Sequence, residues 1–476
     1  MKKSLVFMVL ILSISLASFA QFSQSVDVSK TPGIPSRNPS VCFGPDGIVH
    51  MVWTENHTSM SSDILYVNFD GVTWSAPIAL TPSPKFVTTF PFIASNSKGQ
   101  MAVIWESNRG ETWLREYDVA TKTWLPALEL DPAIYGYLDK PKVALDDDNN
   151  IYCFYFTRGL GWGTAKCRIN GVWETHVNLN EPGLRVKEGM IAVGSDGTIW
   201  VVYAVKETSG EYKIFYRKRT ASTYWSKSHM PYPGGHSEEQ PYVAIGPDDV
   251  PRVSFIGNAG VEGSNAINML TINEKNNPIE MVVPPSIHHY PRIAVDNNNV
   301  EHIATEWGQG DKGLAIRYTN HEGGKWTPVV SLPNSGGGPK LPGIAAEAFG
   351  NIAIVWDSML DNSYEAWFTS RYPVVVKRFL PPVDLSISVS VTSVKLNPLI
   401  TYSLSWAKNP DNNDAFLQGY KIYKKTGDGP FEFVLEVDKT TFAQSFQMTT
   451  MTGKVQFAIS TVSITGVDGD QVIFGL

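Results

Sequence analysis

Acidic side chains recur along this chain at positions where two pairs of them could cleave a glycosidic bond. Glu188 and Glu239 lie 51 residues apart, and so do Glu306 and Asp357. Hydrolysis of a glycoside needs two carboxyl groups across the bond, roughly 5 to 10 Å apart according to whether the configuration is retained or inverted. Either pair could meet that spacing on adjacent structural units, and the sequence singles out neither.

A second chemistry, elimination from an acidic polysaccharide, needs a base beside a cation. Tyr290 or His289 could act as the general base, while Lys140, Lys187 or Arg37 neutralises a uronate carboxylate. The same polar positions also fit a loop edge that is simply solvated, because loop tips are polar in most proteins. The residue types therefore permit this chemistry without requiring it.

Recognition of a sugar without catalysis needs the same kinds of side chain. The hydroxyl groups of a sugar need fixed donors and acceptors, and its apolar face stacks on a ring. If the chain is an enzyme, the catalytic candidates are Glu188, Glu239 and Tyr290. The predicted ligand-binding residues are Arg37, Phe90, Glu106, Asp139, Lys140, Lys187, Glu188, Glu239, His289, Tyr290, Glu306, Trp307 and Asp357.

A sequence repeat occurs seven times, at intervals of 48 to 52 residues. The strands that it forms must position these side chains. Each copy has an anchor, a short apolar run, a polar turn and a second apolar run. The position fourteen residues after the anchor is aromatic in six of the seven copies. This period predicts an all-β fold, a seven-bladed β-propeller in which each repeat forms one sheet. The anchors are Pro39, Pro91, Pro141, Gly189, Pro241, Pro291 and Pro342.

The repeat also predicts where the candidate residues lie. The first two strands of a blade run antiparallel, so residues just before the first and just after the second emerge on one face, around the central channel. The seventh repeat lacks a fourth strand, and residues 25–32 resemble the end of one. We therefore expect the N-terminus to close the ring, since closure removes exposed sheet edges.

The turns before the outer tryptophans resemble worn copies of the Asp box of sialidase-like, or BNR, propellers. Thr319, Gly323 and Trp326 keep its spacing with His321 in place of the aspartate. Asp70-Gly71 before Trp74 keeps the residue types but is one residue short. Sialidases also use an arginine triad, and no such triad can be matched here. The resemblance therefore implies the architecture and not sialidase activity.

Beyond the repeats, short β-rich runs resemble a fibronectin type III domain. The resemblance rests on Trp406, on Tyr420 and Tyr423, and on a late strand followed by Gly466. The chain departs from the family at Phe457, where a tyrosine would form the corner hydrogen bond. The predicted organisation is a signal peptide at 1–20, a propeller at 21–372, a linker at 373–382 and a fibronectin type III-like β-sandwich at 383–476.

The N-terminus indicates export. Lys2 and Lys3 precede an apolar stretch that ends in small residues, as in a bacterial secretory signal, and no later segment is apolar enough to cross a bilayer. We expect a periplasmic, cell-surface or extracellular protein. Without the two signal lysines the chain has 37 basic and 46 acidic residues, which argues against nucleic acid as a partner.

Little in the sequence indicates a cofactor, a metal or a disulfide scaffold. There is no glycine-rich phosphate loop and no CxxC pair, and a tight turn explains the acidic run 146–150. Cys153 and Cys167 lie symmetrically about a turn, so they are either bridged or free. Cys42 stands at an apolar strand position and is predicted to be a buried free thiol.

These observations favour an exported binding or scaffold protein that recognises a glycan or an extracellular protein ligand on the channel face. The alternative is a carbohydrate-active enzyme, either a glycoside hydrolase or a polysaccharide lyase. The sequence leaves the ligand's identity and the oligomeric state open.

Overall fold

The computed structural model of the chain consists of β-strands, turns and loops in the residues it describes. The predicted signal peptide and most of the predicted linker fall outside these residues. Within this part of the chain no helix is long and apolar enough to span a membrane. The described residues are 22–81, 87–131, 138–157, 160–231, 237–258, 265–273, 276–309, 312–333, 336–347, 351–371, 381–392, 399–410, 412, 417–427, 429–448, 454–463 and 471–474.

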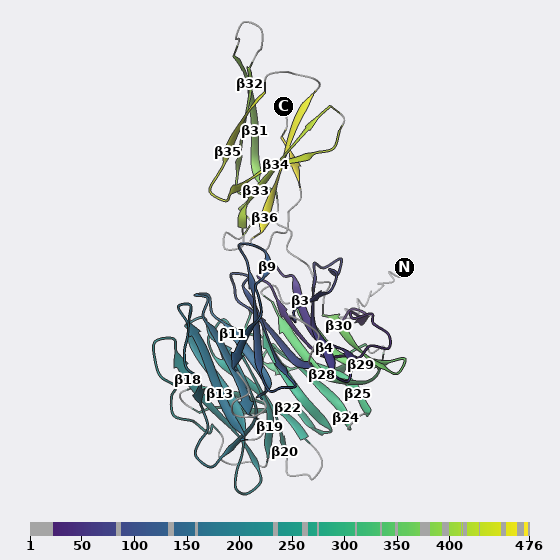
Figure 1. Cartoon of the computed structure of the whole chain (residues 1–476), viewed down its shortest axis with the longest axis vertical. Helices are drawn as coiled ribbons and strands as arrows, with labels where there is room; N and C mark the ends of the chain where they lie inside the picture. Colours follow the sequence, from purple (N-terminus) through teal and green to yellow (C-terminus); the bar gives the residue numbers. More distant parts are fainter. Residues whose placement is uncertain are drawn as a thin grey trace, which may run out of the picture.

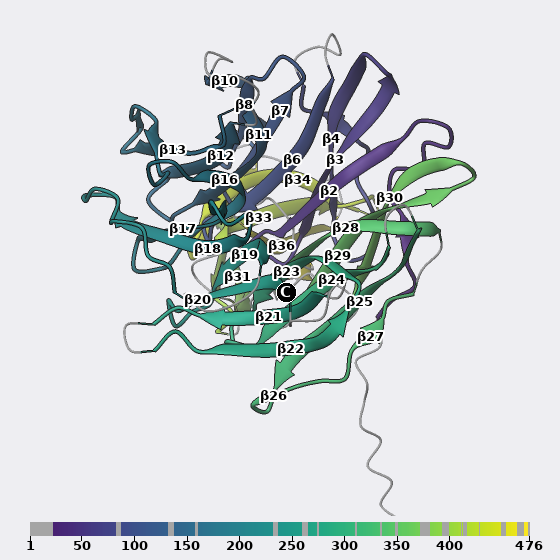
Figure 2. The ribbon, with the colours of Figure 1, turned by 90° about the horizontal axis from the view of Figure 1, so that it is seen from below.

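Seven antiparallel sheets follow one another along the chain and are arranged radially around a common centre (Figure 2). Their first strands contact one another in order, and the first strand of the seventh sheet contacts that of the first. The chain is therefore an all-β protein built on a β-propeller, and we call the sheets blades one to seven.

The strands of each blade are hydrogen-bonded mainly in chain order. Blade one has β2 (Ser36–Phe43), β3 (Val49–Thr58), β4 (Ser61–Phe69) and β5 (Ile78–Ala79). Blade two has β6 (Thr88–Ser95), β7 (Met101–Ser107), β8 (Thr112–Asp118), β9 (Thr123–Trp124) and β10 (Leu128–Asp131). Blade three has β11 (Leu138–Leu145), β12 (Ile151–Thr157), β13 (Trp162–Ile169), β14 (Val172–Trp173) and β15 (Val177–Asn178).

The remaining blades repeat this arrangement. Blade four has β16 (Arg185–Val193), β17 (Thr198–Lys206) and β18 (Tyr212–Thr220). Blade five has β19 (Glu238–Ile245), β20 (Pro251–Asn258), β21 (Asn265–Thr271) and β22 (Ile279–Ser286). Blade six has β23 (His288–Val295), β24 (Glu301–Gln309), β25 (Lys312–Glu322), β26 (Lys325–Trp326) and β27 (Val330–Ser331). Blade seven has β28 (Gly337–Ala346), β29 (Ile352–Leu360) and β30 (Ser363–Ser370).

The N-terminal segment supplies the outer strand that the seventh repeat lacks. β1 (Val26–Asp27) pairs antiparallel with β30, with Val26 opposite Phe368. Just beyond it, the buried Ser29 donates a hydrogen bond to Glu365 Oε2 at 2.7 Å and accepts one from the Ala366 amide at 3.1 Å. Residues from the two ends of the propeller sequence are thus joined in one sheet.

The periodic residues of the sequence form the core between the blades. The six aromatic side chains fourteen residues after the anchors are each at most 3% exposed. The position two residues after each anchor is a buried valine or isoleucine. Both sets point between neighbouring sheets, as alternation along a strand requires. The valines and isoleucines are Val41, Ile93, Val143, Ile191, Val243, Ile293 and Ile344.

The position three residues after each anchor is small in every blade, and five of these seven residues line a second cavity. It holds a cysteine in blade one and an alanine in the other six: Cys42, Ala94, Ala144, Ala192, Ala244, Ala294 and Ala345.

All three cysteines are buried and free. The possible bridge between Cys153 and Cys167 does not form, because their strands are paired one residue out of register for it. Cys153 lies opposite Lys166, and Cys167 lies opposite Tyr152. The prediction that Cys42 is a buried free thiol is confirmed, and burial raises its pKa to about 12.

The side chains of two motifs from the sequence analysis are engaged in contacts within the protein. In the acidic run, Asp146 accepts hydrogen bonds from the backbone amides of Asp148 and Asn150, each at 2.9 Å, which agrees with the tight turn predicted there. In blade six, His321 stacks on Trp326, and its Nδ1 lies 3.1 Å from Glu301 Oε2. No cluster of potential metal ligands occurs among the described residues.

The C-terminal residues form a second body, a β-sandwich drawn at the top of Figure 1. One sheet has the order β31 (Val383–Thr392), β32 (Leu399–Ala407), β35 (Ala443–Met448). The other has the order β34 (Glu432–Asp438), β33 (Leu417–Thr426), β36 (Val455–Ser463), β37 (Val472–Ile473). Their shared core contains Tyr402, Trp406, Tyr420 and Phe457.

We predict that Ser29→Ala lowers the free energy of unfolding by about 1–3 kcal/mol, because it leaves buried Glu365 without the Ser29 hydrogen bond and removes the acceptor of the Ala366 amide. Urea denaturation measures the change. Ser222→Ala, at an exposed position, is the control and should be near neutral. Equal stability of the two variants would show that the N-terminal segment does not hold blade seven together.

Candidate functional site

Every blade begins with a bulge at the mouth of the central channel. In each first strand the pairing with the second strand shifts register near the anchor, as between Arg37 and Ser40. In six blades the residue just before the anchor has positive φ, between 46° and 57°. These residues are Asn38, Phe90, Lys140, Gln240, Tyr290 and Leu341.

Such a conformation is unfavourable for side chains like those of Phe90, Tyr290 and Leu341. A non-glycine residue held there costs of order 1–3 kcal/mol and persists only where its surroundings fix it. The proline that follows has no N–H, so the interrupted ladder leaves no donor unpaired at the anchor. Further contacts must hold the bulge residue itself.

A carboxylate of the preceding blade provides that contact in three places. The amide of Lys140 donates to Glu106 Oε2 at 2.8 Å, that of Leu341 to Glu306 Oε2 at 3.2 Å, and that of Asn38 to Asp357 Oδ2 at 3.1 Å. All three acids stand fifteen residues after their anchors, in the second strand of the blade. We call these contacts between an acceptor of one blade and the bulge amide of the next the blade clamps.

Blades four and five form blade clamps in a different way. They carry Ala204 and Ile256 fifteen residues after their anchors, so the residue before the anchor supplies the acceptor instead. The Gln240 amide donates to Glu188 Oε1 at 3.0 Å, and the Tyr290 amide donates to Gln240 Oε1 at 2.5 Å. Blades four, five and six are therefore clamped in series.

The blade clamps determine what the predicted acidic residues can do. Glu106, Glu306 and Asp357 are 6%, 4% and 0% exposed, and they lie behind the channel wall rather than on a ligand face. Burial raises the pKa of Glu306 to about 6, and burial also raises that of Asp357, which in addition accepts from Arg37 Nε at 3.1 Å. The proposed catalytic pair Glu306 and Asp357 is thus occupied with backbone and arginine contacts.

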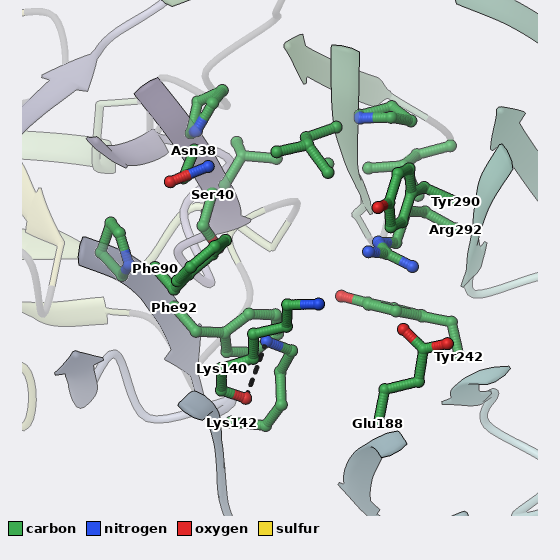
Figure 3. A pocket seen from close by; sticks show the side chains of 17 residues that line it. Asn38, Ser40, Phe90, Phe92, Lys140, Lys142, Glu188, Tyr242, Tyr290 and Arg292 are labelled. Atoms are coloured by element: carbon green, nitrogen blue, oxygen red, sulfur yellow. Dashed lines mark hydrogen bonds between the residues drawn. The ribbon is translucent and has the colours of Figure 1, made fainter. Parts of the chain in front are cut away.

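A cavity of about 670 Å³, including space open to solvent, lies where the bulges meet (Figure 3). Phe90, Lys140, Glu188 and Tyr290 reach it from the predicted positions before the anchors. Figure 3 shows their side chains, with those of Tyr242 and Arg292, converging from different blades.

Two cationic side chains of the cavity lie over its aromatic rings. Lys142 Nζ lies 5.0 Å from the centre of the Phe92 ring, and the Arg292 guanidinium lies 4.9 Å from that of Tyr242 and 5.6 Å from that of Tyr290. Such cation–π contacts place positive charge against the faces of the rings.

Burial raises the pKa of Tyr242 to about 12 and also raises that of Tyr290. Both phenols therefore stay protonated at neutral pH and can donate hydrogen bonds to a ligand. Neither hydroxyl has a hydrogen-bond partner among the described residues. The cavity thus presents fixed, unoccupied donors beside aromatic faces.

The other predicted residues lie outside this cavity. Lys187 and Glu239 form an ion pair with each other and are not among the residues that line the cavity. Trp307 donates to Ser286 Oγ at 3.1 Å and is covered by Arg317.

The last three predicted residues have different settings. The Arg37 guanidinium packs on Tyr364, 3.8 Å from its ring centre. His289 is half-buried, its ring 6.3 Å from that of Tyr290, and does not line the cavity. Asp139 lies in β11, but its side chain falls outside the described residues.

Four charged or aromatic cavity residues are not among those predicted from the sequence: Phe92, Lys142, Tyr242 and Arg292. All stand one residue after an anchor, inside the first strand, where alternation alone suggests burial. A signal was present, because that position varies widely while the next is always valine or isoleucine. Variation beside a uniformly apolar position indicates that the side chain faces something other than the core.

The chain matches no protein-family model and no curated protein sequence. Solved structures that resemble it include a protein of unknown function from Dyadobacter fermentans, which is 14% identical with a TM-score of 0.49, the match covering 74% of this chain and 98% of that one. An ulvan lyase is 12% identical with a TM-score of 0.49, covering 70% and 93%. A Hadza microbial sialidase is 11% identical with a TM-score of 0.39, covering 70% and 65%. Similarities this distant carry no argument about function.

We predict that Asp357→Ala lowers the free energy of unfolding by about 2–3 kcal/mol, since the Asn38 amide and Arg37 both lose a charged acceptor. Asp357→Asn, which keeps one oxygen acceptor, should lose less. The control is Asp148→Ala, which removes an exposed carboxylate. Denaturation midpoints that fall equally for all three variants would contradict the blade clamp.

The pH dependence of stability tests the burial of Glu306. Because burial raises the pKa of Glu306 from 4.5 to about 6, the folded protein binds this proton more tightly than the unfolded chain. The contribution of this proton to the free energy of unfolding is complete below pH 4.5 and is lost as the pH rises to about 6. Glu306→Gln cannot titrate, so its stability should fall less across this window in urea denaturation. Parallel pH profiles for the variant and the wild type would contradict this assignment.

Proposed function

We propose that the chain is an exported, non-catalytic protein that binds a glycan in the central-channel cavity. One observation supports this above all: aromatic faces and unpaired polar groups converge on one cavity, while most predicted catalytic acids are held in blade clamps or ion pairs. A sugar needs hydrogen-bonding groups around its edge and a ring beneath its apolar face. Tyr242, Tyr290 and Phe90 meet those needs, and Glu188 offers an acceptor.

Hydrolysis by two carboxyl groups has less support. Glu188 is the one carboxylate among the residues that line the cavity in the described structure, and a glycosidase needs two. A sialidase-like activity likewise has little support, because Arg292 is the one arginine among those lining residues. The propeller is nevertheless of the sialidase-like kind in its repeat and its worn Asp boxes.

The second candidate is a polysaccharide lyase. It is favoured by one arrangement, in which Tyr290 lies beside Arg292 in a cavity that also contains Lys140. A tyrosine next to a cation is a suitable base for removing a proton beside a neutralised carboxylate. Against it, the raised pKa of Tyr290 makes the phenolate less accessible at neutral pH.

The remaining parts of the chain have supporting roles in this proposal. Residues 1–20 direct export and are removed. The C-terminal sandwich is of the fibronectin type III kind and holds the propeller away from the surface that carries it. Such modules serve as spacers on many unrelated proteins, so the sandwich bears on the setting and not on the ligand.

We predict that the chain without residues 1–20 binds specific glycans on an array and releases no product from them. Phe90→Ala should weaken the strongest interaction about 5- to 30-fold, as expected for an aromatic residue at the centre of an interface. The control is Tyr224→Ala, which removes a tyrosine that is 97% exposed and distant in sequence from the bulges.

The same array distinguishes the two candidates. Unsaturated uronate products, lost in Tyr290→Phe while binding persists, would establish the lyase and overturn the non-catalytic proposal. Absence of binding to every glycan would contradict both and direct the search to protein ligands.

A further inference from the structure

We infer that the ligand of the channel cavity carries an anionic group, a carboxylate or a sulfate ester, and that Lys140 and Arg292 hold it. This inference rests on the proposed glycan-binding function and specifies the class of glycan. It follows from the charges that line the cavity and from the partners those charges have.

The residues that line the cavity have a net positive charge, whereas the whole chain has a net negative charge. The whole sequence has a net charge of −7. The lining, by contrast, contains the cations Lys140, Lys142 and Arg292 against the single carboxylate Glu188. Clefts with low-dielectric walls concentrate the field of the charges that line them, so a small cationic cavity attracts anions even on an acidic protein.

Two of these cations have no carboxylate partner. Lys140 Nζ lies 5.8 Å from the centre of the Phe90 ring, and the Arg292 side chain donates to the backbone carbonyl of Pro291 at 3.3 Å. Neither forms an ion pair with any residue that the structure describes. The cations just outside the cavity differ, because Arg37 is paired with Asp357 and Lys187 with Glu239.

Leaving a half-buried cation unpaired is costly, and the cost is relieved by a matching anion. Burial lowers the pKa of Arg292, because its charge is poorly hydrated in the cavity wall. A guanidinium presents several donors in one plane and therefore suits the oxygens of a carboxylate or a sulfate. Lys140 supplies a mobile point charge to the same group (Figure 3).

The carboxylate of Glu188 further restricts the class of glycan that fits the cavity. Its Oε1 accepts the Gln240 amide at 3.0 Å, which leaves Oε2 available to a ligand. A carboxylate in the cavity wall repels a second anionic group and accepts hydrogen bonds from hydroxyls. The fitting ligand thus has one acidic group per cavity together with sugar hydroxyls, as in a uronic acid or a sulfated sugar.

The test compares matched glycans by isothermal titration with the chain lacking residues 1–20. The probes are an oligomannuronate tetrasaccharide, its neutral methyl ester, and a sulfated galactose tetrasaccharide with its desulfated form. We expect at least one acidic member to bind about tenfold or more tightly than its neutral partner, a size typical of hydrogen bonds to charged groups. Raising the salt concentration should reduce that preference.

Variants assign the preference to the two cations. Lys140→Met and Arg292→Gln should each reduce the acidic-over-neutral ratio several-fold. Lys187→Met removes a paired cation at the rim, so it is the matched control and should keep the ratio. A carboxylate-only or a sulfate-only preference identifies the source of the anion.

The outcomes separate this inference from the function on which it rests. Equal binding of acidic and neutral partners, or a ratio that survives both substitutions, would overturn the anionic class and leave glycan binding intact. No binding of any probe, together with an empty glycan array, would overturn the proposed function and this inference with it.

Discussion

A backbone amide that donates to an acceptor on the preceding blade is the contact on which the channel face depends. Six first strands contain a left-handed, non-glycine residue at their bulge, and five of those residues have their amide bound across the blade boundary. Each blade clamp offsets local backbone strain and joins two sheets at the same time. It also fixes the direction in which Lys140 and Tyr290 project, because the side chain of a bulge residue follows its φ.

This arrangement explains why an acid-rich face yields a cationic cavity. Glu106, Glu306 and Asp357 are withdrawn into the wall, where their oxygens serve the backbone. Lys140 and Arg292, which line the cavity, then form no ion pair with a carboxylate among the described residues. The electrostatic character of the cavity is thus a by-product of how the ring is held together, and it does not follow from the composition of the chain.

The fold was predictable because its signals are local and repeated. Anchors, apolar runs and aromatics at fixed spacing specify each sheet, and the N-terminal match to a fourth strand indicated where it would pair. The site was predictable only in part. Residues before the anchors, such as Lys140 and Tyr290, were found. Tyr242 and Arg292 were missed, because a bulge reverses which side of the strand faces the channel, and strict alternation hides a bulge.

The same limit applies to the roles of the acids. The repeat predicts that Glu306, fifteen residues after an anchor, and Glu188, one residue before an anchor, emerge on the same face. The structure shows that Glu306 is buried behind the wall while Glu188 lines the cavity. Hydrogen exchange at the amides of Asn38, Lys140, Gln240, Tyr290 and Leu341 tests the blade clamps most directly. The account predicts protection comparable to that of the central strand amides of the same blades. Exchange at the rate of open loops would contradict it.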